Sequence, residues 1–181
     1  RKVGCCLIAA VAAFGAVADN PWQGKNVAFL GDGLTAAAEN APRYWSVLQT
    51  NLGLTPWVYA SAGATMAQIK SQAEALKAEH ATGVDGIVVL AGLEDYAADC
   101  PLGSWYQVSG TPPQRQFALD ANTFRGRINL ALDYLKDNFP EAEIVLLTPI
   151  HRAAARFSPT NVQPDESFPN DRGLYVDAYV K

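Results

Sequence analysis

The sequence is short of cysteine and histidine, with three cysteines and two histidines in 181 residues. Cys5 and Cys6 stand in an apolar run at the start of the chain, which leaves Cys100 as the one cysteine after it. A disulfide framework within the remainder of the chain is therefore excluded. Cys100 is expected to be a buried or loop thiol rather than a nucleophile, because no histidine lies near it in the sequence.

Basic clusters are also missing. The formal net charge is −4, and no group of lysines and arginines could follow a phosphate backbone. Nucleic acid is therefore not an expected partner. The chain has no internal repeat and no low-complexity tract, and its apolar content of 49% is ordinary for a single globular domain.

The start of the chain has the pattern of a secretory signal peptide. Two basic residues precede an uncharged apolar run over 3–17, and Ala-Val-Ala at 16–18 is a small-residue cleavage pattern. The run is short for a membrane span, so an uncleaved anchor is the weaker alternative. We expect residues 1–18 to be removed, the domain to occupy 19–181, and the protein to be secreted or periplasmic, without a membrane partner after cleavage.

Strand-like and helix-like segments alternate along the rest of the chain. Continuous apolar runs predict strands at 27–30, 55–60, 86–91 and 143–149, and helical spacing predicts helices at 44–52, 66–79 and 123–138. This alternation predicts a flavodoxin-like three-layer α/β/α fold with a doubly wound parallel sheet. The stretches 92–122 and 151–172 read as loops, and a helix begins near 173 with no strand after it. The last strand is therefore expected to be missing.

Three glycine-containing turns follow three successive predicted strands. They read Gly-Asp-Gly-Leu-Thr at 31–35, Ser-Ala-Gly-Ala-Thr at 61–65 and Gly-Leu-Glu-Asp-Tyr at 92–96. In a parallel sheet the carboxyl ends of the strands meet at one edge, which is where open α/β sheets bind ligands. Glycines there let backbone N–H groups approach a developing oxyanion.

These turns resemble the first three sequence blocks of the SGNH, or GDSL-type, hydrolases. The first block of that family reads Gly-Asp-Ser-Leu/Ile-Thr, and this chain has Gly33 in place of the nucleophilic serine. Gly63 matches the glycine whose N–H joins the oxyanion hole. The third block reads Gly-x-Asn-Asp, and Glu94 replaces its asparagine. The resemblance implies no cofactor and no metal.

The fourth block of the family, Asp-x-x-His, is not complete in this sequence. Residues 165–169 imitate it, with Phe168 where the histidine belongs, and they read as ordinary loop. The resemblance implies a secreted esterase acting on a small-molecule or carbohydrate ester. Without the serine and the histidine base, however, we expect the chain to be inactive in serine-dependent hydrolysis.

Two functions from different classes therefore stay open, with a nucleotide-binding module as a weak third because the turn at 31–33 lacks a dinucleotide fingerprint. One is a hydrolase of this family. The other is a non-catalytic relative that binds a glycan or a protein in the old active-site crevice.

Other side chains at this edge have both functional and structural interpretations. Asp32, Glu94 and Asp95 could form a metal or acid/base cluster, but the family uses both aspartates to support their loops. Glu94 could fill the volume that Gly33 leaves empty. Thr35 is expected to be a structural hydroxyl, and His151 is a candidate crevice residue for which a backbone-bonded loop position is the favoured alternative.

Aromatic residues are frequent in the stretch after the third predicted strand. The stretch 93–122 contains Tyr96, Trp105, Tyr106 and Phe117, which could stack against sugar rings or pack as a small satellite core. Tyr96 and Trp105 are the ligand-binding candidates among them.

Two charged sites outside the turns are expected to have ordinary surface roles. The pair Arg125 and Arg127 is interpreted as surface charge rather than as an anion clamp. His80 is expected to be a solvated residue at the end of a helix, facing its dipole.

Overall fold

The computed structural model describes residues 20–36, 42–148, 155–156 and 162–163 of the chain. The elements, in order, are β1 (Asn26–Gly31), α1 (Tyr44–Leu52), β2 (Thr55–Ala60), the 3-10 helix η1 (Met66–Gln68), α2 (Ile69–Glu79), β3 (Gly86–Leu90), α3 (Leu93–Ala97), β4 (Tyr106–Ser109), β5 (Gln114–Phe117), α4 (Phe124–Asn138), β6 (Glu143–Leu146), β7 (Ala155–Arg156) and β8 (Val162–Gln163). The expected signal peptide, the imitation of the fourth block and the helix expected near 173 lie outside the described residues.

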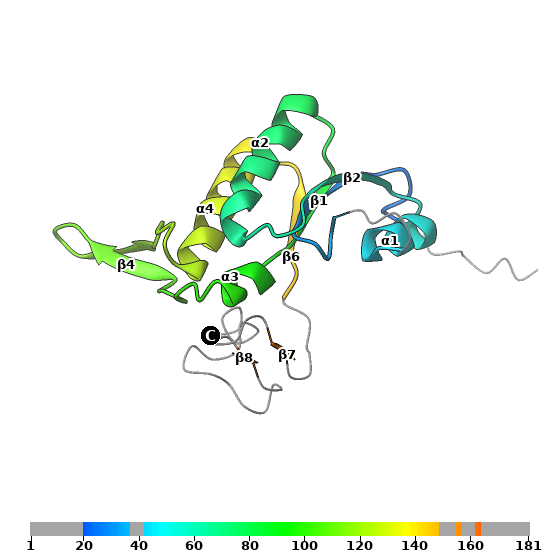
Figure 1. Ribbon diagram of the computed structural model, residues 1–181. Helices are drawn as coiled ribbons and strands as arrows, with labels where there is room; N and C mark the ends of the chain where they lie inside the picture. Colours follow the sequence, from blue (N-terminus) through cyan, green and yellow to red (C-terminus); the bar gives the residue numbers. More distant parts are fainter. Residues whose placement is uncertain (1–19, 37–41, 149–154, 157–161, 164–181) are drawn as a thin grey trace, which may run out of the picture.

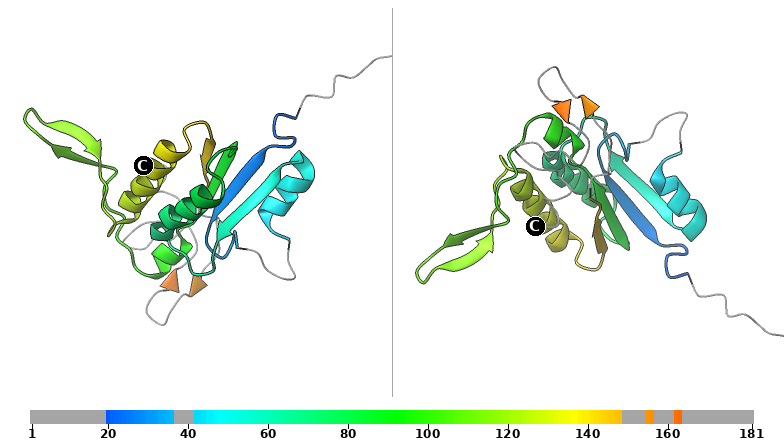
Figure 2. Two further views of the ribbon diagram at one scale, coloured as in Figure 1. Left: turned by 90° about the horizontal axis from the view of Figure 1, so that it is seen from above. Right: turned by 90° about the horizontal axis from the view of Figure 1, so that it is seen from below.

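Four of these strands form one parallel sheet in the order β2-β1-β3-β6. The sheet lies between α1 on one face and α2 with α4 on the other, which gives three layers (Figures 1 and 2). The predicted three-layer α/β/α fold with a parallel sheet is confirmed. All four predicted strands and all three predicted helices are present, with shifts of only a few residues at their ends.

Alternate residues of β1 explain why the sheet is covered on both faces. Ala28 and Leu30 belong to the buried cluster that also holds residues of α2 and α4, whereas Val27 and Phe29 pack in a second cluster with residues of α1. Successive side chains of a strand point to opposite faces, so a strand between two helical layers must be apolar throughout.

The α1 side of the sheet is less completely covered than the other side. An apolar hollow of about 200 Å³ lies there, with Trp22, Leu48, Val88 and Val145 among its lining residues. Val145 of β6 keeps 42% of its surface exposed. Within the described part of the chain, β6 is one of the two edge strands of the sheet, and β2 is the other.

The stretch 93–122, predicted as a loop, instead contains the short helix α3 and a β-hairpin. Strands β4 and β5 pair antiparallel, with Tyr106 opposite Phe117 and Ser109 opposite Gln114. We call residues 106–117 the arm, because they project from the α4 side of the body (Figures 1 and 2). The loop prediction was wrong because the abundance of glycine and proline obscured the alternation of Tyr106 and Val108 with polar residues.

His80 stands at the end of α2, as expected, but it is not simply solvated. Its ring stacks on Trp57 of β2, with 3.6 Å between ring centroids and 5° between ring planes. None of the helices in the described ranges is both long enough and apolar enough to span a membrane.

Candidate functional site

The three glycine-containing turns leave the sheet at the same level. Gly31, the last residue of β1, pairs with Ala60 of β2 and with Leu90 of β3, which are also the last residues of their strands. The turns that follow are therefore brought together at one edge, as the sequence predicted. We call this the carboxyl edge of the sheet.

The end of β1 is tightly enclosed. A Cβ atom on Gly31 would lie 2.2 Å from the carbonyl oxygen of Leu90 and 2.6 Å from Thr35 Oγ1, so glycine is required there. The side-chain amide of Gln72 on α2 accepts from the Gly31 N–H at 2.8 Å and donates to its carbonyl at 2.9 Å. The first turn is thus fixed at its base by both the neighbouring strand and α2.

Asp32 and Thr35 stabilise the first turn from within. Asp32 is 2% exposed, and its Oδ1 accepts from the N–H of Leu34 at 2.9 Å. Thr35 is fully buried, with its hydroxyl 3.2 Å from that of Tyr44 and its carbonyl accepting from Trp45 Nε1 at 2.9 Å. Thr35 is therefore a structural hydroxyl, as expected, and its burial excludes it as a nucleophile.

Gly33 differs sharply from Gly31. Among the described residues, a Cβ atom there would meet only Ala62, at 3.7 Å from its Cα and 3.9 Å from its Cβ, which is ordinary van der Waals contact. The described surroundings of Gly33 therefore leave room for a Cβ. Gly63, in the second turn, has φ +78°, so its backbone is left-handed, and no atom of the described residues lies within 4 Å of the place that a Cβ would take.

Glu94 does not fill the space beside Gly33. No Glu94 atom lies within 4 Å of the position that a Cβ on Gly33 would take, so the expectation that the two positions compensate each other sterically is wrong. Glu94 acts on its neighbours through charge instead. Burial raises the pKa of Asp32, and the charges of Glu94 and Asp95 raise it further. The Asp32 carboxyl therefore lies near two other carboxyl groups at this edge.

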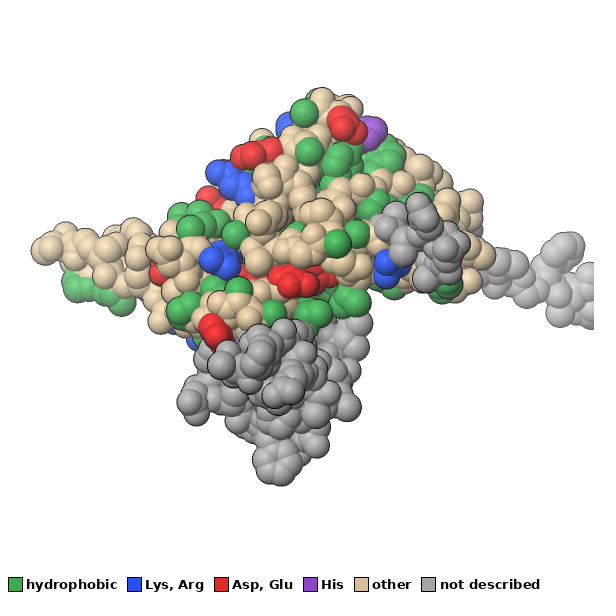
Figure 3. Space-filling model, in the orientation of Figure 1, with side chains coloured by type: hydrophobic (Ala, Val, Ile, Leu, Met, Phe, Trp, Pro, Cys, Tyr) green, Lys and Arg blue, Asp and Glu red, His purple; other side chains and the backbone are tan. Residues whose placement is uncertain are grey.

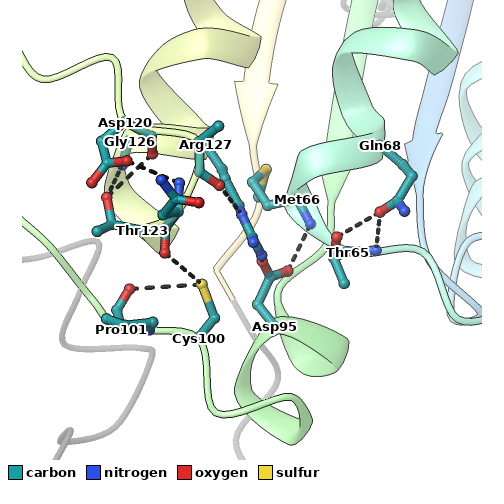
Figure 4. Close-up of polar contacts among 12 residues, drawn as sticks. Thr65, Met66, Gln68, Asp95, Cys100, Pro101, Asp120, Thr123, Gly126 and Arg127 are labelled. Carbon is teal, nitrogen blue, oxygen red and sulfur yellow. Dashed lines mark hydrogen bonds and ion pairs between the residues drawn. The ribbon is translucent and has the colours of Figure 1, made fainter.

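Asp95 holds the second and third turns together (Figure 4). It is fully buried, its Oδ2 accepts from the Met66 N–H at 2.6 Å, and its Oδ1 pairs with Arg127 Nη1 at 2.7 Å. Met66 directly follows the turn that carries Gly63. Asp95 therefore supports its loop, as the resemblance implied. The interpretation of Arg127 as surface charge was wrong, because its side chain is only 21% exposed and neutralises a buried carboxylate.

The aromatic candidates are not gathered at the carboxyl edge. Tyr96 is 1% exposed in the main core, so its ring is not available for stacking against a ligand. Trp105 packs partly buried against that core, with the Arg125 guanidinium 5.4 Å from its ring centroid. Tyr106 and Phe117 stack on each other in the arm. His151 lies outside the described residues.

Metal ligation finds no support in the part of the chain that the structure describes. No group of three His, Cys, Asp or Glu side chains is placed there to hold an ion. The carboxylates of Asp32 and Asp95 are instead committed to backbone N–H groups, and Asp95 also to Arg127.

Sequence reasoning did not identify two residues that shape this edge. Gln72 carries no motif, although its place on the buried side of a predicted helix is a weak signal. Arg127 lies 32 residues from Asp95, and only the packing of α4 beside α3 and η1 brings the two together.

Neither the protein-family models nor the curated protein sequences match this chain. Solved structures do. A protein of Lactobacillus plantarum is 23% identical with a TM-score of 0.61, over 87% of this chain and 69% of its own. A possible lipase from Chitinophaga pinensis is 18% identical with a TM-score of 0.60, over 85% of this chain and 60% of its own. A GDSL-like lipase from Parabacteroides merdae is similar at 16% identity and a TM-score of 0.48, over 77% and 68%.

The chain therefore has the same α/β fold as the first two of these structures. The match of its three turns to the first three blocks of the SGNH hydrolases is a resemblance in sequence. It spans 60% of the length of the lipase structure and 69% of the Lactobacillus plantarum protein.

Proposed function

We propose that this chain is a secreted or periplasmic binding protein that holds an acylated carbohydrate at the carboxyl edge without hydrolysing its ester. The observation that carries the proposal is Gly33. It stands at the end of β1, where the hydrolases of this fold have their serine, and it offers no hydroxyl to attack an acyl group.

The remaining groups of the edge agree with binding rather than catalysis. Asp32 is buried and bonded to its own turn, and Thr35 is enclosed. Glu94 stands where the family has an amide donor, and an ionised carboxylate accepts hydrogen bonds but cannot donate them. Its charge opposes the full negative charge of the oxyanion in a tetrahedral intermediate, and it repels the partial negative charge of an ester carbonyl oxygen much less.

The space beside two glycines of the edge supports binding of a carbonyl group. Neither Gly33 nor Gly63 has a side chain, and the surroundings of both are open in the described structure. The residues 1–18, with their signal-peptide pattern, support a location outside the cytoplasm, where acylated polysaccharides are found.

The experiment compares cleavage with binding, using an acetylated xylo-oligosaccharide and its deacetylated form. Isothermal titration calorimetry measures binding to the native chain, and mass spectrometry of the recovered ligand measures loss of acetyl groups. We expect binding of the acetylated form with its acetyl groups intact. Release of acetate in proportion to the amount of native protein would overturn the proposal. A native chain that binds neither the acetylated nor the deacetylated oligosaccharide would also overturn it.

A pair of variants places the binding at the carboxyl edge. Gly33→Phe fills the space beside Ala62, so we expect it to abolish binding. Ala78→Phe adds the same side chain at an exposed position near the far end of α2 and is expected to bind like the native chain. Equal binding by both variants would exclude the carboxyl edge as the ligand site.

A further inference from the structure

In the part of the chain that the structure describes, side-chain hydrogen bonds to α4 hold the arm at its base. The buried side chain of Asn129 on α4 donates from Nδ2 to the carbonyl of Trp105 at 3.0 Å and to that of Ala118 at 2.9 Å, so it bridges the two ends of the hairpin. All the residues of β4 and β5 are exposed. An isolated two-stranded hairpin is marginally stable in water, which means that a long, exposed one needs something to pack against.

The two faces of the arm differ in chemistry. Because residues opposite each other share a face, Tyr106, Val108, Arg115 and Phe117 lie on one side. The other side carries the uncharged polar residues Gln107, Ser109, Gln114 and Gln116. In the view of Figure 3, hydrophobic side chains lie along the lower border of the arm.

The apolar face is a ridge of stacked side chains rather than a flat platform. The rings of Tyr106 and Phe117 stack with 5.2 Å between centroids, and the Arg115 guanidinium lies 3.7 Å from the centroid of the Tyr106 ring. Tyr106 therefore has neighbours on its ring already, which leaves little ring surface for a sugar. Val108 and Phe117 remain 70% and 57% exposed, as expected of side chains that pack against a protein surface.

Charge favours a second copy of this chain as the partner. Residues 101–119 contain no acidic side chain, and Arg115 is their one charged residue. The rest of the chain holds all 18 acidic residues and 13 of the 14 basic ones, so its net charge is −5. An arm with a positive charge is thereby complementary to the body of another copy.

Size favours a reciprocal arrangement. The arm has about 12 residues, whereas a stable interface takes about 20–30 residues from each partner. One arm lying on one body falls short of that number. Two arms exchanged about a two-fold axis reach it, because each copy then contributes its own arm and the surface that receives the other.

We propose that two copies of this chain form a dimer by exchanging arms, with the apolar face of each arm packed on the body of the other copy. The proposal is independent of any ligand at the carboxyl edge. The measurement is the mass of the full chain in solution by light scattering after gel filtration, repeated over a range of protein concentrations. We expect twice the mass of one chain. A native protein that stays monomeric over the whole concentration range would overturn the proposal, even if the arm binds another kind of partner.

Two neighbouring substitutions test the face. Val108→Asp and Gln107→Asp add the same charge on opposite faces of β4, at exposed positions of the arm. We expect Val108→Asp to raise the dimer dissociation constant by about 30-fold or more, as at a central interface residue, and Gln107→Asp to leave the dimer intact. Unchanged dimers in Val108→Asp, or equal dissociation by both variants, would overturn the assignment. Unaltered far-UV circular dichroism excludes misfolding.

Discussion

Removing the guanidinium of Arg127 is expected to destabilise the whole domain. The substitution Arg127→Met keeps much of the aliphatic side chain but leaves the fully buried Asp95 carboxylate without its cation at 2.7 Å. Breaking a buried ion pair by removing one partner costs about 3–5 kcal/mol. Because Arg127 is 21% exposed, water can partly replace it, so we expect a loss of about 2–4 kcal/mol in the free energy of unfolding.

The assay is urea denaturation followed by far-UV circular dichroism, with Arg125→Met as the matched control on the same helix. Arg125 donates Nη1 to the carbonyl of Gly103 at 3.1 Å and neutralises no buried carboxylate among the described residues, so its loss is expected to cost about 1 kcal/mol or less. The double variant Asp95→Asn/Arg127→Met is expected to be more stable than Arg127→Met, because it contains no uncompensated buried charge. Equal stability of the two single variants would refute the reasoning.

Three further substitutions test separate features of the structure. Gly31→Ala is expected to lower the free energy of unfolding by at least about 2 kcal/mol in urea denaturation, because its Cβ would overlap a carbonyl oxygen of β3. The hydrogen bond from Lys25 lowers the pKa of Asp85. The native protein should therefore be more stable than Asp85→Asn at neutral pH, and this difference should disappear as the pH falls below about 4. Melting temperatures measured at several pH values test this. Burial, with the hydrogen bond to Glu79, raises the pKa of Tyr59 to about 12. In urea denaturation, native protein should therefore lose stability relative to Tyr59→Phe as the pH rises from about 10 to 12. A difference in stability that does not change with pH would contradict this.

The sheet could be predicted from the sequence because its central strands are buried on both faces. Residues 27–30 and 86–91 are continuous apolar runs, and such runs occur where helices cover both sides of a parallel sheet. The convergence of the three turns follows from that topology alone. The arm escaped prediction because one of its strands, Gln-Arg-Gln-Phe at 114–117, has only one apolar residue, and because an exposed hairpin leaves little hydrophobic pattern.

The side chains of the candidate site were less predictable because their roles depend on distances that cross the fold. Nothing near Arg127 in the sequence indicates a buried acidic partner 32 residues away. Tyr96 illustrates the opposite error, since an aromatic residue after a ligand-binding turn resembles a binding residue until the packing of α3 places it in the core. The open space at Gly33 depends on how the first turn passes Ala62 of the second turn, and this cannot be predicted from the residues of either turn.

The contrast between Gly31 and Gly33 separates what folding demands from what chemistry demands. The two glycines are two positions apart. Gly31 has no room for even a methyl group, whereas a methyl group on Gly33 would touch only Ala62 among the described residues. A small side chain at position 33 is therefore expected to have little effect on the stability of the domain, so selection for stability does not fix the residue there. Conservation of Gly31 or Asp95 among relatives would accordingly report on the scaffold, whereas the residue at position 33 could vary with function rather than with folding.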